Sequence, residues 1–131
     1  MSESIPFSVP VEGVEVKKFS QNSHNYLHFT FNGKFTHELS SDAIDEWKSQ
    51  CKMNPSEKFV HIWDCQNMSG FDKQAKDLWM EQMNSLYDQT ERIVLVSDNI
   101  IIRGAARLMS RFTKHTLCAY RTLVEMSAAE L

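Results

Sequence analysis

The sequence predicts an α/β domain in which a mixed β-sheet of about five strands carries three to four helices, mainly on one face. Three observations favour this fold. The chain has 131 residues, which is typical of one domain. From residue 58 onward, short apolar segments alternate with helical patterns, as in parallel sheets with crossover helices. The first two apolar segments lie close enough in sequence to pair antiparallel.

The N-terminal part of the chain predicts an arm and two strands. Residues 1–11 contain prolines and serines and are expected to form a flexible N-terminal arm, with the domain at 12–131. Apolar and polar residues alternate over 12–19, which indicates a half-buried strand. A second strand, rich in aromatic residues, is predicted over 26–31. The following Asn32-Gly33 pair signals a tight turn or, because little strand-like sequence follows it, a simple bend toward the next helix.

The remaining elements follow from periodicity. Apolar residues at helical spacing predict a first helix at 40–51, with Ser40, Ser41 and Asp42 as caps and first-turn residues. The third helix is expected to turn five residues inward: Ile101, Ala105, Leu108, Met109 and Phe112. The predicted order continues with a strand at 58–64, a helix at 71–87, a strand at 92–97, a helix at 101–112, a strand at 116–120 and a helix at 122–131.

The stretch WDCQNMSGFDKQ, residues 63–74, joins a predicted strand to a predicted helix. With Ser69 as N-cap, Asp72 falls three residues later, which resembles a capping box. The alternative is a phosphorylatable serine or an anion site at the start of the helix. Asp64 ends the buried strand, where it either serves a ligand or accepts hydrogen bonds from the loop.

Composition and motifs disfavour several functional classes. The net charge of −3 does not favour general nucleic-acid binding. Three cysteines without a CxxC pair indicate reduced thiols in the cytoplasm. The sequence shows no signal-peptide pattern and no apolar run long enough to span a membrane. Because no HExxH motif or Cys/His cluster occurs, we expect no metal site and no cofactor.

Three arginines, Arg103, Arg107 and Arg111, recur every four residues on the predicted third helix. They form either an ordinary solvated face or a cationic strip. A cationic strip would suit an acidic partner, a phosphate-bearing ligand or an anionic membrane surface.

Four segments together resemble the SpoIIAA-like branch of the STAS superfamily: NGKFTHE (32–38), WDCQNMSGFD (63–72), RIVLVSD (92–98) and GAARLM (104–109). The resemblance covers roughly residues 12–131 and implies a STAS-like fold. It also implies a switch or docking module, of which anti-sigma-factor antagonists are the best-known kind. Those antagonists are controlled by phosphorylation of a serine at the start of the helix after the middle strand, which makes Ser69 the phosphorylation candidate here.

The same branch is similar in shape to lipid-carrying CRAL-TRIO domains. Together with the docking role, this resemblance implies two hypotheses for this chain. The first is a non-enzymatic cytoplasmic regulatory module that binds a protein partner. Its docking edge would contain Asp64, Ser69, Gly70, Asp72, Lys73 and Lys76. The second is binding of a lipid or other apolar ligand at the periphery of the inner membrane, with Arg103, Arg107 and Arg111 as anion or membrane contacts. No assembled catalytic residues are recognisable, and a homodimer is a further expectation.

Overall fold

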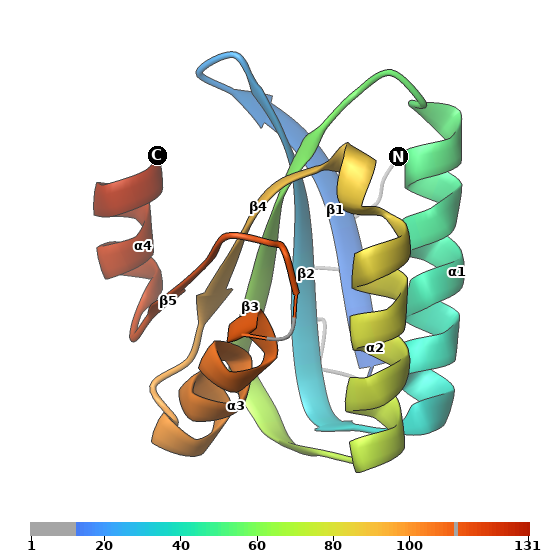
Figure 1. The fold of residues 1–131 in the computed structure, drawn as a ribbon. Coiled ribbons are helices and arrows are strands. Elements are labelled where there is room, and N and C mark those ends of the chain that lie inside the picture. Colours follow the sequence, from blue (N-terminus) through green and yellow to red (C-terminus); the bar gives the residue numbers. More distant parts are fainter. Residues whose placement is uncertain (1–12, 112) are drawn as a thin grey trace, which may run out of the picture.

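The computed structural model describes residues 13–111 and 113–131, which form a five-stranded mixed sheet with four α-helices (Figure 1). The predicted α/β class is therefore confirmed. The predicted arm at 1–11 and the side chain of Phe112 lie outside the described residues. The elements are β1 (Gly13–Gln21), β2 (His24–Phe35), α1 (His37–Met53), β3 (Phe59–Phe71), α2 (Lys73–Ser85), a short 3₁₀ helix η1 (Tyr87–Gln89), β4 (Thr90–Val96), α3 (Ile100–Arg111), β5 (Leu117–Tyr120) and α4 (Leu123–Glu130).

The strands follow one another in the sheet in the order β1-β2-β3-β4-β5. β1 and β2 pair antiparallel through a turn in which Asn22 and Ser23 have positive φ, and the other three pairings are parallel. Figure 1 shows α1, α2 and α3 on one face of the sheet and α4 on the other. Because the strand order never reverses among these five strands, the sheet lacks the switch-point crevice that holds ligands in many α/β enzymes.

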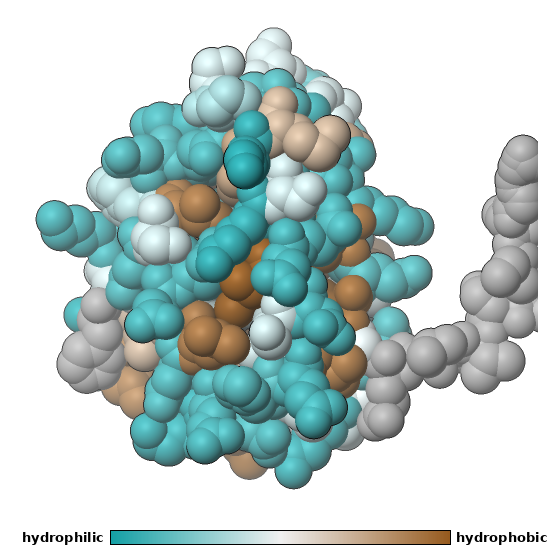
Figure 2. All heavy atoms as spheres, turned by 90° about the vertical axis from the view of Figure 1, so that its right-hand side faces the viewer, coloured by the Kyte–Doolittle hydropathy of each residue, from teal (hydrophilic) through white to brown (hydrophobic). Residues whose placement is uncertain are grey.

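The main core lies between the sheet and α1 and α2. Trp47 and Trp79 are buried on the inward faces of their helices, with ring centroids 4.7 Å apart. Phe29 of β2 contacts both rings in edge-on arrangements, at 5.2 and 5.5 Å. Each such aromatic pair adds about 0.5–1.5 kcal/mol beyond the area it buries. The surface over these two helices is mainly hydrophilic, as Figure 2 shows.

A second apolar cluster lies on the opposite face of the sheet, where Met126 of α4 packs against β2, β3 and β4. Three side chains fasten this helix. The Glu130 carboxylate accepts a hydrogen bond from Arg92 Nε at 2.8 Å and one from the Tyr120 hydroxyl at 2.6 Å. The hydrogen bond to Glu130 raises the pKa of Tyr120 to about 12.

Two central strands are longer than predicted. The prediction of a tight turn at Asn32-Gly33 is wrong, because β2 continues to Phe35 and β3 continues to Phe71. Gly33 adopts φ +78° at a register shift between the two strands, so its conformational freedom serves a bulge. A glycine in such a pair is typical of both hairpin turns and bulges. Here β2 continues past Gly33 beside its parallel partner β3, so the glycine lies in a bulge.

The predicted capping box at Ser69 is also wrong. Asp72 occupies the N-cap position of α2, and Ser69 lies three residues earlier in extended β3. The first helix begins before the predicted Ser40, because the Thr36 hydroxyl accepts a hydrogen bond from the backbone N–H of Leu39. Ser40 itself is buried in the first turn, where its hydroxyl donates to the His37 carbonyl.

Candidate functional site

The last seven residues of β3, 65–71, extend beyond the end of the neighbouring strand β4. β3 pairs with β4 only as far as Asp64, which lies opposite Val96, whereas its pairing with β2 continues to Phe71. Within the described residues, this segment therefore has a strand neighbour on one side only. Its side chains at Gln66, Asn67 and Ser69 are exposed. An unpaired strand edge of this kind is a template for an added strand.

Asp64 stands where this extension begins, and it is 8% exposed. Its Oδ1 accepts hydrogen bonds from the backbone N–H and the side-chain amide of Gln66, both at 3.2 Å. Its Oδ2 lies 3.7 Å from His28 Nε2, a distance typical of an ion pair. Burial raises the pKa of Asp64, but the contacts with His28 and Gln66 outweigh it and leave the pKa below its ordinary value. The carboxylate therefore stays charged and holds the start of the extension.

The other end of the extension is fixed at the start of α2. The backbone N–H of Asp72 donates to the Phe35 carbonyl at 3.0 Å, and the Asp72 carboxylate forms an ion pair with Lys34 Nζ at 3.1 Å. Lys73, one of the predicted docking residues, forms an exposed ion pair with Asp77 at 2.8 Å. The structure thus brings the predicted docking residues onto one continuous ribbon between Asp64 and the first turns of α2.

Ser69 and Gly70 lie inside this ribbon. The Ser69 side chain is exposed, and no hydrogen bond of its hydroxyl occurs within the described part of the chain. Gly70 has open space around the position that a Cβ would occupy. Ser69 does not form an anion site at the start of a helix, because α2 begins only at Lys73. Its hydroxyl remains accessible to a modifying enzyme, so phosphorylation of Ser69 stays a prediction.

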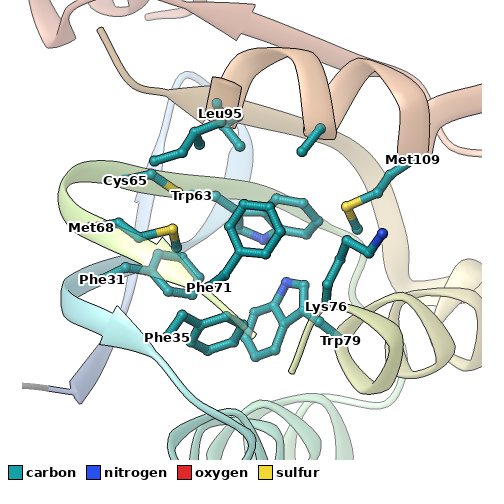
Figure 3. A pocket seen from close by; sticks show the side chains of 12 residues that line it. Phe31, Phe35, Trp63, Cys65, Met68, Phe71, Lys76, Trp79, Leu95 and Met109 are labelled. Atoms are coloured by element: carbon teal, nitrogen blue, oxygen red, sulfur yellow. The ribbon is translucent and has the colours of Figure 1, made fainter. Parts of the chain in front are cut away.

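An apolar cavity of about 50 Å³ lies behind the ribbon, between the sheet, α2 and α3 (Figure 3). Lys76 is the charged member of its lining, and the other members are apolar. A space of this size admits a few atoms but not an acyl chain. The lining consists of Phe31, Phe35, Trp63, Cys65, Met68, Phe71, Lys76, Trp79, Leu95, Ile102, Ala105 and Met109.

Helix α3 closes this cavity with a different face from the one predicted. Ile102, Ala106 and Met109 are buried, whereas Ile101 is 71% exposed and Leu108 is 50% exposed. The prediction that Ile101 and Leu108 face inward is wrong. Three consecutive isoleucines begin this helix, so its apolar pattern spans more than one face and does not fix the rotation. Ile100, also 72% exposed, extends the apolar surface at the start of the helix.

The predicted arginine strip divides into two parts. Arg103 is half-buried, and one of its guanidinium nitrogens donates to the Ser97 carbonyl at 2.9 Å, which ties α3 to the end of β4. Arg107 and Arg111 are exposed, and neither forms an ion pair with another described residue. These two exposed cations of α3 therefore lie beside its exposed apolar residues.

The thiols and imidazoles do not form a reactive cluster. Burial raises the pKa of the Cys51 thiol to about 11 and that of Cys65 still further, so neither is a thiolate at neutral pH. Within residues 13–111 and 113–131, no group of three metal-ligating side chains lies together. The contact between His28 and Asp64 is not predictable from the sequence, because the register of two parallel strands is not readable from either strand alone. No helix of the described residues is long and apolar enough to cross a membrane.

The comparisons with known proteins concern the fold. No family model and no curated sequence matches this chain. A crystal structure of an uncharacterized protein from the DUF3478 family of Shewanella loihica, described as having a SpoIIAA-like fold, superposes with a TM-score of 0.74. The identity is 16%, over 95% of this chain and 99% of that one. The unphosphorylated anti-sigma factor antagonist SpoIIAA superposes with a TM-score of 0.63 at 13% identity, over 89% of this chain and 96% of that one. The protein therefore has the SpoIIAA-like STAS fold that its sequence motifs predict.

Proposed function

We propose that the protein is a non-enzymatic regulatory module that binds a protein partner along the ribbon from Asp64 to Lys76. The observation that carries this proposal is the unpaired edge of residues 65–71, flanked by exposed polar side chains. An extended segment of the partner would add to this edge, with main-chain hydrogen bonds providing affinity. The name of the similar structure, an anti-sigma factor antagonist, supports a role in protein–protein regulation. The proposal includes a cytoplasmic location.

Phosphorylation of Ser69 would regulate this binding. A phosphate adds about −1.5 to −2 charges at neutral pH. The ribbon already carries Asp64 before Ser69 and Asp72 after it. A phosphate between these carboxylates makes the edge strongly anionic and hinders a strand from pairing beside it. Ser69 phosphorylation is therefore proposed as an off-switch.

Site-specific photo-crosslinking in cells tests the docking edge. A photoreactive residue is placed at Asn67 on the ribbon and, as a matched control, at the exposed Ser41 on α1. We expect one partner to crosslink at Asn67 and not at Ser41, and to bind Ser69→Ala normally. Ser69→Glu is expected to weaken binding by about tenfold, which corresponds to ~1.4 kcal/mol. Equal crosslinking at both positions, or normal binding of Ser69→Glu, would argue against the proposal.

A second candidate function is binding of an apolar ligand at an anionic membrane surface. It rests on the apolar cavity under α3 and on the exposed Ile101 and Leu108 beside Arg107 and Arg111. The outer face of α3 would insert among lipid headgroups while the arginines contact phosphates. Because the cavity holds only about 50 Å³, an acyl chain would enter only after α3 moves away from the sheet.

Vesicle sedimentation separates this candidate from the first. We expect the protein to sediment with anionic vesicles and not with neutral ones. Ile101→Asp should abolish sedimentation, because it places a carboxylate in the contacting face. Val124→Asp is the matched control, since Val124 is 79% exposed on α4, across the sheet from α3. Equal loss in both variants, or no sedimentation of the unmodified protein, would exclude membrane binding through α3.

A further inference from the structure

An open surface hollow of about 490 Å³ lies at the C-terminal end of α2, away from the docking ribbon at the start of that helix. Its volume falls in the range of small-molecule sites. Five described residues line it: Asn84, Tyr87, Arg111, Thr113 and Lys114. Two of them are cations and none is a carboxylate.

Among the described residues, no carboxylate neutralises the two cations of the hollow. Arg111 is the last residue of α3, where its positive charge interacts favourably with the free carbonyls at the end of the helix. Lys114 lies beyond the helix, so the helix dipole does not explain its presence. Neither side chain forms an ion pair with another residue of 13–111 or 113–131. Two like charges that line one hollow repel each other, and a bound anion would relieve this repulsion.

The remaining side chains suit a particular kind of anion. The Asn84 amide and the Thr113 hydroxyl are neutral hydrogen-bond donors, and a guanidinium binds phosphate oxygens in pairs. Tyr87 contributes an aromatic ring that is 46% exposed. His115 positions this ring edge-on at 5.1 Å and is itself anchored by Nε2, which lies 2.8 Å from the Met83 carbonyl. A fixed aromatic face beside two cations fits a ligand with both a phosphate and a ring.

We propose that this hollow binds a phosphate monoester of a small ring-bearing molecule. Arg111 and Lys114 hold the phosphate, Asn84 and Thr113 donate hydrogen bonds to it, and Tyr87 covers the ring. The site lies apart from the docking ribbon, so the inference does not depend on the proposed partner. A lipid headgroup with a terminal phosphate offers the same phosphate chemistry, and the experiment includes an arm that distinguishes the two sources.

Titration of the full chain with phenyl phosphate, followed by NMR and calorimetry, tests the proposal. We expect submillimolar binding, weaker binding of inorganic phosphate, and no binding of phenol. Arg111→Gln and Lys114→Gln should each weaken phenyl phosphate by about tenfold, equivalent to ~1.4 kcal/mol. Arg107→Gln is the matched control, because Arg107 lies one turn earlier on α3 and does not line the hollow. Tyr87→Ala should remove the preference for phenyl phosphate over inorganic phosphate.

Several outcomes decide the matter. Binding that is equally weakened by Arg107→Gln reflects general cationic attraction and overturns the site. Absence of binding at millimolar phenyl phosphate, together with no sedimentation on phosphatidic acid vesicles, also overturns it. Sedimentation on those vesicles without phenyl phosphate binding supports the phosphate subsite and assigns a lipid as its source, if it is lost in Lys114→Gln and kept in Lys48→Gln, at an exposed lysine of α1. Thermal melting of each variant confirms that these exposed substitutions leave the fold intact.

Discussion

His61 makes the stability of this protein dependent on pH in a way that can be measured. The side chain is fully buried in β3, and its Nε2 accepts a hydrogen bond from Trp47 Nε1 at 3.0 Å. The ring is therefore neutral, with its hydrogen on Nδ1, for which the described structure offers no partner. Burial, followed by repulsion from His115, lowers the pKa of His61 from 6.5 to about 3.

The direction of the effect follows from proton binding in the two states. Between pH 6.5 and about pH 3, the unfolded chain binds a proton at His61 and the folded protein does not. The free energy of unfolding therefore decreases as the pH falls through this window and does not change through His61 above it. Each pH unit is worth ~1.36 kcal/mol, so at about pH 5 the expected loss is roughly 2 kcal/mol.

Urea denaturation followed by tryptophan fluorescence across this pH range provides the assay. His61→Gln removes the titrating group, and its side-chain oxygen can still accept the hydrogen bond of Trp47. We expect the free energy of unfolding of this variant to fall less steeply with decreasing pH, because the contribution of His61 is absent. Its stability relative to wild type should therefore increase steadily as the pH falls below 6.5. His37→Gln, at an exposed histidine, is the matched control. If His61→Gln and wild type show parallel slopes, a buried neutral imidazole is not the cause of acid destabilisation.

Three further substitutions test other parts of the fold. Gly33→Ala should destabilise the protein by about 1–2 kcal/mol, because φ +78° strains any residue with a Cβ; an unchanged denaturation midpoint would contradict the bulge. Gly104→Ala, at an exposed helical position with free space around its Cβ, should instead stabilise by about 1 kcal/mol in the same assay, and a loss of stability would contradict the placement of α3. Glu130→Gln should lower the pKa of Tyr120 from about 12 towards its ordinary value of 10.0, as followed by ultraviolet titration. An unchanged pKa would show that the Glu130 carboxylate does not accept a hydrogen bond from the tyrosine hydroxyl.

Local patterns in the sequence were sufficient for the class and order of the elements. The alternation of apolar strands with helical repeats predicted the parallel sheet, and the short first connection predicted the antiparallel start. Trp47 and Trp79 each lie in a single clear apolar stripe, so the sequence alone is enough to place both on the buried faces of their helices. The motifs that resemble SpoIIAA-like proteins predicted the fold that the structural comparisons confirm.

Tertiary structure alone decided the features on which the functional proposals depend. Ser69 lies in a strand because β2 continues beside it past Gly33, and a polar segment by itself does not reveal such a partner. Helix α3 has more than one apolar face, and packing against the sheet buries the one that contains Ile102 and Met109. Ile101 lies on another face and is therefore exposed. The hollow around Arg111 joins residues from α2, η1, α3 and the connection that follows α3. Sequence periodicity indicates which face of each helix or strand is apolar and which is polar. These sites form between elements, and only the packing of the elements determines which of their side chains lie together.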